Sequence, residues 1–189
     1  MKAAVIKGAG KTPVYGDFEM PVAKAGDELI SVRAAALSNL TKSRASGSHY
    51  SSDGVYPAVA GVDGVGVRED GRRVYFAMPE APFGALAEFC PVNSRRCVEI
   101  PGSLDDITAA AIANPGMSAW AALVERAHLV AGETVLVNGA TGTAPQSGFP
   151  CPMVPLLEAA RKFGEYRSYS VGARKPVEAL PRKVSMSIG

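Results

Sequence analysis

Cysteine is scarce in this chain, and the few cysteines that occur form no recognisable pattern. Cys90, Cys97 and Cys151 are odd in number, and no two of them stand in Cys-x-x-Cys spacing. This argues against a disulfide framework, which needs pairs of cysteines in an oxidising compartment. A reducing cytoplasm is therefore the expected location.

Long apolar runs and a strong net charge are missing as well. No uninterrupted run of about eighteen apolar residues occurs, so no membrane span is expected. Charge interrupts the segment Met1–Gly8 too early for a secretion signal. A net charge of +2 gives no reason to expect nucleic acid or an anionic membrane as a partner. A hydrophobic content of 47% indicates a soluble globular protein with a real core.

The first hundred residues are rich in short β-compatible runs separated by Gly, Pro, Asp and Ser. The predicted strands are Ala3–Ile6, Glu28–Ala34, Gly64–Arg68, Arg73–Phe76, Leu86–Pro91 and Cys97–Ile100. This spacing is typical of a small barrel or sandwich. Asp70-Gly71 predicts a hairpin turn. The polar, serine-rich segment Leu37–Tyr56 predicts a surface loop or short helix, where binding residues are often found.

Two helices are expected next. Ser103 is the predicted cap of the first, which begins near Leu104 and ends where Asn114-Pro115-Gly116 interrupts it. Met117–Arg126 is the second predicted helix, with Trp120 on its apolar, core-facing side.

A strand followed by a glycine turn is the most informative feature of the chain. Thr134–Val137 predicts a buried strand, and Asn138-Gly139-Ala140-Thr141-Gly142 follows it. Small residues at such a turn let backbone N–H groups approach a dinucleotide pyrophosphate. Pro145 replaces the expected third glycine, and further prolines delay the next predicted helix, Leu156–Phe163.

Several runs, taken in this order, resemble the medium-chain dehydrogenase/reductases, on their zinc-independent quinone-oxidoreductase side. The resemblance covers residues 1–144 and is carried by an opening strand, an active-site loop, a glycine-rich strand, a "GDRV" hairpin, a "GxxAEY" strand and a crossing helix. These correspond to Met1–Val5, Ser38–Lys42, Pro57–Val67, Gly71–Tyr75, Gly84–Phe89 and Ala113–Leu123.

The resemblance implies a mainly β fold with an α/β remnant. A GroES-like β-barrel, residues 1–125, would be followed by the start of a Rossmann-type unit, residues 126–189. In zinc-dependent relatives a cysteine would stand at Ser38 and a His-Glu pair at Val62-Asp63. Valine has no donor atom and serine is a poor zinc ligand, so no metal site is predicted.

The resemblance also assigns site residues. Asn39 and Tyr50, on the loop that also holds Lys42 and Tyr56, are the predicted substrate-facing hydrogen-bond donors. A turn cap for Asn39 and packing for the tyrosine are the alternative interpretations. Ser118 matches the position that contacts the nicotinamide. The predicted pyrophosphate contacts are Asn138, Gly139, Ala140, Thr141, Gly142 and Thr143.

The implied activity is hydride transfer from NADP(H) to a quinone or enone substrate. Arg174-Lys175 would suit a 2′-phosphate and so favours NADP over NAD. Only 45 residues follow Ala144, room for one βαβ unit at most, and no second Rossmann strand is identifiable. Three interpretations stay open: an oxidoreductase of shortened chain, a catalytically silent barrel acting as a binding or oligomerisation module, and a homodimer that rebuilds a nucleotide site between two chains.

Overall fold

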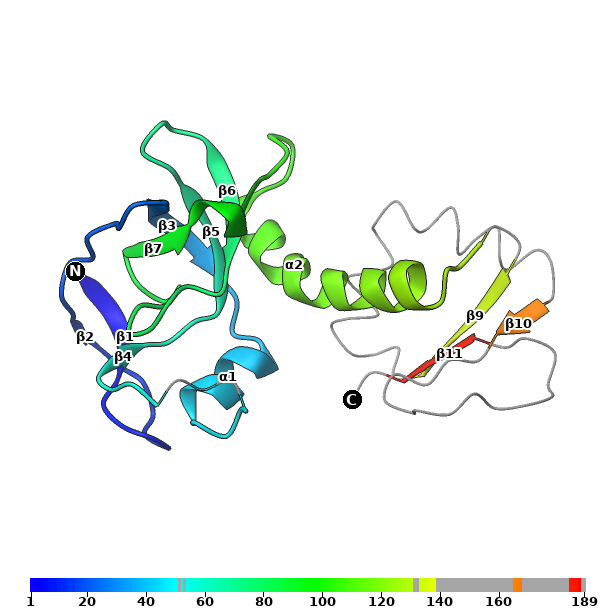
Figure 1. Cartoon of the computed structure of the whole chain (residues 1–189), viewed down its shortest axis with the longest axis horizontal. Helices are drawn as coiled ribbons and strands as arrows, with labels where there is room; N and C mark the ends of the chain where they lie inside the picture. The colour runs from blue at the N-terminus through cyan, green and yellow to red at the C-terminus, as the bar shows by residue number, and fades with distance from the viewer. Residues whose placement is uncertain (51, 53, 131–132, 139–164, 168–183, 188–189) are drawn as a thin grey trace. The chain divides into compact units, whose positions relative to one another are not determined.

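The computed structural model describes residues 1–50, 52, 54–130, 133–138, 165–167 and 184–187 (Figure 1). The chain divides into two units, Met1–Ala111 and Ile112–Gly189. This division lies on the N-terminal side of the domain boundary predicted after residue 125. The boundary at residue 125 stays a prediction.

The first unit is built on two antiparallel sheets. The larger has the strand order β7-β3-β5-β6-β8, and the smaller has the order β2-β1-β4. The bounds are β1 Lys2–Ile6, β2 Val14–Asp17, β3 Asp27–Ala35, β4 Ala58–Val59, β5 Asp63–Val67, β6 Arg73–Ala77, β7 Phe89–Asn93 and β8 Cys97–Glu99. The strands curl around a common interior (Figure 1), and the predicted fold class, a GroES-like barrel followed by the start of a Rossmann-type unit, is confirmed.

Each of the six strands predicted in the first hundred residues has a counterpart, with one shift in position. The strand predicted at Leu86–Pro91 is β7, which begins only at Phe89. β2 was not predicted, because Val-Tyr-Gly-Asp is short and contains a glycine that weakens a strand signal.

A hydrophobic cluster of Ile30, Val74, Phe76, Ala85, Cys90 and Val92 forms the centre of the larger sheet's core. Gly66 explains why the β5 sequence is glycine-rich. A Cβ at that position would lie 2.5 Å from the Ile30 side chain and from the Ser31 carbonyl oxygen, so no larger residue fits.

The hairpin predicted from Asp70-Gly71 joins β5 to β6. Gly71 adopts φ +83°, in the left-handed region, and its N–H donates to the Arg68 carbonyl at 3.0 Å. Glycine adopts this conformation without steric penalty, which is why the dipeptide marks the turn.

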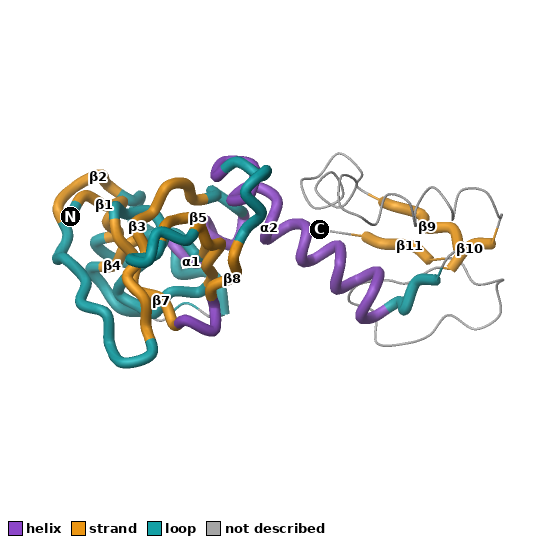
Figure 2. The backbone as a smooth tube through the Cα atoms, turned by 90° about the horizontal axis from the view of Figure 1, so that it is seen from above, coloured by secondary structure: helices purple, strands orange, loops and turns teal. Residues whose placement is uncertain are grey.

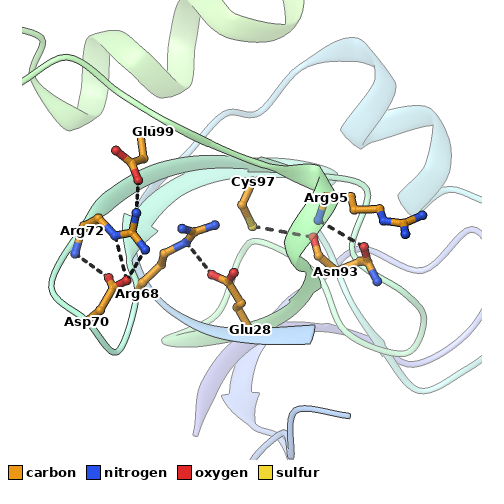
Figure 3. Close-up of polar contacts among 8 residues, drawn as sticks. All are labelled: Glu28, Arg68, Asp70, Arg72, Asn93, Arg95, Cys97 and Glu99. Atoms are coloured by element: carbon orange, nitrogen blue, oxygen red, sulfur yellow. Dashed lines mark hydrogen bonds and ion pairs between the residues drawn. The ribbon is translucent and has the colours of Figure 1, made fainter. Parts of the chain in front are cut away.

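Charged side chains connect this hairpin to neighbouring strands (Figure 3). Arg68 Nε lies 2.5 Å from Glu28 Oε2 on β3. Arg72 pairs with Asp70 at 2.7 Å and also with Glu99 at the end of β8. The hydrogen bond from Arg72 lowers the pKa of the Asp70 carboxyl. Because these charges are paired with one another, the cluster serves to fix the strands.

The two helices predicted between residues 104 and 126 form one continuous helix. α2 runs from Asp106 to Trp120 and continues as a π-helical segment, Ala121–Arg126 (Figure 2). Pro115 lies inside α2. Its fixed φ near −65° is compatible with helical geometry, so it removes one backbone hydrogen bond without ending the helix. The predicted interruption is therefore wrong.

Two further predictions about this helix are also wrong. Its N-terminal cap is Asp105, whose Oδ1 accepts a hydrogen bond from the Thr108 N–H at 2.9 Å, and not Ser103. Trp120, predicted to lie in the core, keeps 44% of its surface exposed.

Within the described residues, the helical stretch Asp106–Arg126 is long and apolar enough to cross a membrane, by length and composition alone. Polar residues inside it interrupt the apolar run, so counting uninterrupted runs missed it. The core helix of a soluble protein meets the same two criteria, so this is weak support for a span. The absence of a membrane partner stays a prediction.

The second unit contains a parallel sheet of order β10-β9-β11 among its described residues. β9 is Glu133–Asn138, β10 is Glu165–Arg167 and β11 is Val184–Ser187. β9 confirms the strand predicted at Thr134–Val137. No second Rossmann strand after β9 is identifiable from the sequence. The structure corrects this, because β10 and β11 both pair with β9. The predicted helix Leu156–Phe163 and the residues Arg174-Lys175 lie outside the described residues.

Candidate active site

The predicted active-site loop contains the short helix α1, Asn39–Ala45, which confirms the expectation of a loop or short helix. Ser38 caps it, since its Oγ accepts a hydrogen bond from the Thr41 N–H at 3.1 Å. Thr41 is buried, and its Oγ1 donates to the Ala36 carbonyl at 3.2 Å. These bonds fix the side of α1 that faces the barrel.

A cavity of about 70 Å³ lies against this helix, and we call it the arginine cavity. Its polar lining comes from Thr41 and Arg44 on α1 and from Ser52 and Tyr56 on the following loop. A guanidinium and a phenol are hydrogen-bond donors, so this lining can stabilise negative charge on a bound oxygen atom.

Arg44 also reaches a strained residue at the end of β6. Its Nη1 lies 3.6 Å from the Met78 sulfur, and Arg96 donates to the Met78 carbonyl. Met78 has φ +54°, a conformation that non-glycine residues rarely adopt, and its N–H is held by the Val62 carbonyl at 2.6 Å. Such strain is often found at functional sites.

Neither of the two predicted substrate donors lines the arginine cavity. Asn39 is the first residue of α1 and is exposed. Tyr50 keeps 95% of its surface exposed, and its ring contacts that of His49 at a tilt of 33°, with ring centroids 4.3 Å apart. Their roles stay predictions. Tyr56, which the sequence placed on the same loop, does line the cavity.

Sequence reasoning missed Thr41 and Arg44 as lining residues. The signal was available in the spacing, since Thr41, Arg44 and Ala45 repeat at i, i+3 and i+4, one face of a helix. The spacing indicates a helix only if Ser38 is taken as its N-terminal cap. From the sequence, Ser38 is considered only as the position of a zinc ligand.

The predicted cofactor contacts belong to the second unit. Ser118 is exposed on α2, and its Oγ donates to the Asn114 carbonyl at 3.4 Å. Asn138 is the last residue of β9. Gly139, Ala140, Thr141, Gly142 and Thr143 lie outside the described residues, so their predicted contacts with pyrophosphate stay predictions.

At the positions where zinc-dependent relatives would have metal ligands, the side chains of this chain have other roles. Ser38 caps α1, and Val62 is a buried aliphatic side chain. Asp63 is 1% exposed, and burial raises the pKa of its carboxyl. Its Oδ2 accepts a hydrogen bond from the Tyr75 hydroxyl at 2.9 Å. No group of three metal-ligating residues occurs in the part of the chain that the structure describes. Zinc independence stays a prediction that rests on the residue types.

Comparison with known proteins reveals relatives, although no family model matches the chain. The quinone oxidoreductase of Pongo abelii is 33% identical over 137 residues, which are 68% of this chain and 41% of that protein. The crystal structure of Thermus thermophilus quinone oxidoreductase, also solved in complex with NADPH, matches with a TM-score of 0.70 and 29% identity. The match covers 87% of this chain and 51% of that one.

A mycobacterial protein solved in complex with NADPH matches with a TM-score of 0.64 and 25% identity, over 77% of this chain and 47% of that one. The chain thus spans about two fifths of the length of the curated relative it matches, 41%. In sequence and in fold, it is related to the quinone oxidoreductases of the medium-chain dehydrogenase/reductase family.

Proposed function

We propose that this chain takes part in hydride transfer from NADPH to a quinone or an activated alkene. Two relatives that are quinone oxidoreductases support this proposal, and two of the matching structures were solved with NADPH. The chain corresponds to only 41% of the curated relative, so the activity of the whole enzyme is proposed here by relationship.

The position of β9 is the observation that carries the proposal. Among the described residues of the second unit, β9 lies between β10 on one side and β11 on the other. The order of strands therefore reverses at β9, and dinucleotides bind at the carboxyl end of a parallel sheet where this reversal occurs. The chain leaves that end of β9 at Asn138 and enters Gly139-Ala140-Thr141-Gly142.

The roles proposed for individual residues follow from this chemistry. Bound NADPH would supply the hydride, and the small residues from Asn138 to Thr143 would hold its pyrophosphate. Hydride addition to a quinone leaves negative charge on an oxygen atom, which hydrogen-bond donors stabilise. We propose Asn39 and Tyr50 as such donors, and we add the guanidinium of Arg44 and the hydroxyl of Tyr56.

Titration of NADPH, followed by its fluorescence, and its oxidation by 1,4-benzoquinone test this proposal. Gly139→Val should weaken NADPH binding by at least about tenfold, because a branched side chain blocks the approach of the pyrophosphate to the backbone. Gly102→Ala is a control for the loss of a glycine elsewhere in the chain, since a Cβ there meets nothing within 4 Å. Equal NADPH binding by the Gly139→Val variant would contradict the proposed cofactor site.

Two further measurements separate the remaining interpretations, and a third tests zinc independence. Activity that rises more than linearly with protein concentration would indicate a nucleotide site shared by a homodimer. No binding at millimolar NADPH, with the first unit folded, would replace the proposal by a catalytically silent binding or oligomerisation module. Activity that survives a zinc chelator would support zinc independence.

A further inference from the structure

A second cavity, of about 290 Å³, lies between α1 and the loop that joins β1 to β2. Lys11 on the loop and Lys42 on the helix both line it, and we call it the lysine pocket. We propose that the lysine pocket binds a small organic acid with an apolar body, whose carboxylate is held by the two ammonium groups.

The walls of the lysine pocket are fixed by backbone hydrogen bonds. The Gly10 N–H donates to the Ser46 carbonyl at 3.1 Å, which ties the β1–β2 loop to the end of α1. Ala60 bonds to Ala4, and Leu86 bonds to Ala60, each at 2.9 Å. Every described lining residue belongs to the first unit.

The lining combines an apolar surface with unbalanced positive charge. Pro13, Leu37 and Leu86 supply the apolar part, and Leu37 keeps 68% of its surface exposed. Among the residues that the structure describes, no aspartate or glutamate lines the pocket. In the described part of the chain, the Lys11 and Lys42 ammonium groups take part in none of the observed ion pairs or hydrogen bonds.

Charge complementarity selects the ligand class. A neutral apolar molecule would leave the two ammonium groups unused, whereas a carboxylate accepts charge-assisted hydrogen bonds from both. The hydroxyl of Thr41, which also lines the pocket, already donates to a backbone carbonyl. A volume of about 290 Å³ is near the lower end of known ligand sites, which favours an acid of one or two rings.

The lysine pocket is separate from the proposed oxidoreductase chemistry. It shares Thr41, Ala45 and Ala60 with the arginine cavity, but neither Arg44 nor Tyr56 lines it. Binding of an acid there requires neither NADPH nor turnover, so failure of one proposal leaves the other intact.

Binding of 2-naphthoate to the full chain, measured by calorimetry without NADPH, tests the inference. We expect saturable binding that Lys11→Gln and Lys42→Gln each weaken by roughly tenfold, the loss of one charge-assisted hydrogen bond. Lys24→Gln, an exposed lysine outside the pocket, should leave the affinity unchanged. The uncharged 2-naphthamide should bind much more weakly than 2-naphthoate.

Three results would overturn the inference: no saturable binding up to millimolar 2-naphthoate, equal affinity for the amide, or an equal loss in the Lys24→Gln variant. Leu37→Asp provides an independent check, because a carboxylate in the lining should repel the ligand and abolish binding. Thermal unfolding of each variant shows that the fold is kept. The Gly139→Val variant should bind 2-naphthoate normally, which separates this test from that of the cofactor site.

Discussion

The two units of this chain hold their sheets together in different ways. In Met1–Ala111 every described pairing between strands is antiparallel, and a tight turn such as Asp70-Gly71 can join neighbours. In Ile112–Gly189 the pairings described are parallel, and residues 139–164 intervene between β9 and β10. A parallel pair needs such a crossover. In the first unit the pairs β1–β2 and β5–β6 therefore form from local hairpins, although β3 also pairs with the distant β7. Both described pairs of the second unit join distant segments.

Local sequence signals were sufficient to predict most strands of the first unit but not most strands of the second. Alternating apolar residues and turn dipeptides predicted most strands of the first unit. In the second unit only β9 was predicted, because β10 and β11 are three and four residues long and carry no periodicity of their own. We therefore expect the first unit to keep its structure independently of the second, and the following variants test this comparison.

The largest effect is expected for Phe76→Ala. Phe76 is fully buried at the centre of the first unit's core. Removing the ring should lower the free energy of unfolding of that unit by about 3–5 kcal/mol. Urea unfolding followed by amide hydrogen exchange, resolved along the chain, measures the loss in Met1–Ala111 and in Ile112–Gly189 separately.

Val98→Ala is the control for Phe76→Ala, since Val98 lies in the same unit with 64% of its surface exposed. A change below about 1 kcal/mol for Phe76→Ala would contradict the core assignment. An equal loss of protection in both units would show that they unfold together.

A smaller effect is expected for Arg73→Ala. The Arg73 Nη2 donates to the Leu104 carbonyl at 2.6 Å and to Asp106 Oδ1 at 2.7 Å, which fixes the start of α2 to β6. Both side chains are about 30% exposed, so solvent screening limits the loss to about 1–2 kcal/mol. Faster hydrogen exchange in the first turn of α2 should accompany it.

Arg95→Ala, at an exposed position, should leave stability unchanged. Combining Arg73→Ala with Asp106→Ala should cost less than the sum of the two single changes, because both remove the same interaction. Full additivity would show that the ion pair does not hold the helix.

Gly71→Ala should destabilise the first unit by about 1 kcal/mol. Alanine is strained at φ +83°, although a Cβ at Gly71 would meet no neighbouring atom within 4 Å. Chemical denaturation of this variant and of the Gly102→Ala control separates backbone strain from loss of glycine flexibility. A stabilised Gly71→Ala variant would contradict the observed turn.

The smallest effect concerns the pH dependence set by Asp63. Burial raises the pKa of this carboxyl above its usual value of 3.8, so the folded state retains a proton that the unfolded state releases. The stability that this proton provides is present below pH 3.8 and is lost as the pH rises through the raised pKa. Relative to the unmodified chain, Asp63→Asn should therefore gain stability as the pH rises above 4.

Asp17→Asn is the control of opposite sign. The ion pair with Lys2 lowers the pKa of Asp17, so its contribution is present at neutral pH and is lost on acidification. Unfolding curves between pH 3 and pH 7 measure both trends. A stability difference between Asp63→Asn and the unmodified chain that stays constant with pH would argue against a retained proton.

The sequence by itself determined most strands of the first unit, the Asp70-Gly71 turn, the existence of β9 and the relationship to quinone oxidoreductases. These depend on local periodicity, on turn chemistry and on the order of motifs along the chain. The tertiary structure decided that α2 continues through Pro115, that Arg44 and Tyr56 line one cavity while Lys11 and Lys42 line another, and that β9 lies between two parallel neighbours. Each of these depends on which distant segments meet, and a local pattern of residue types does not contain that information.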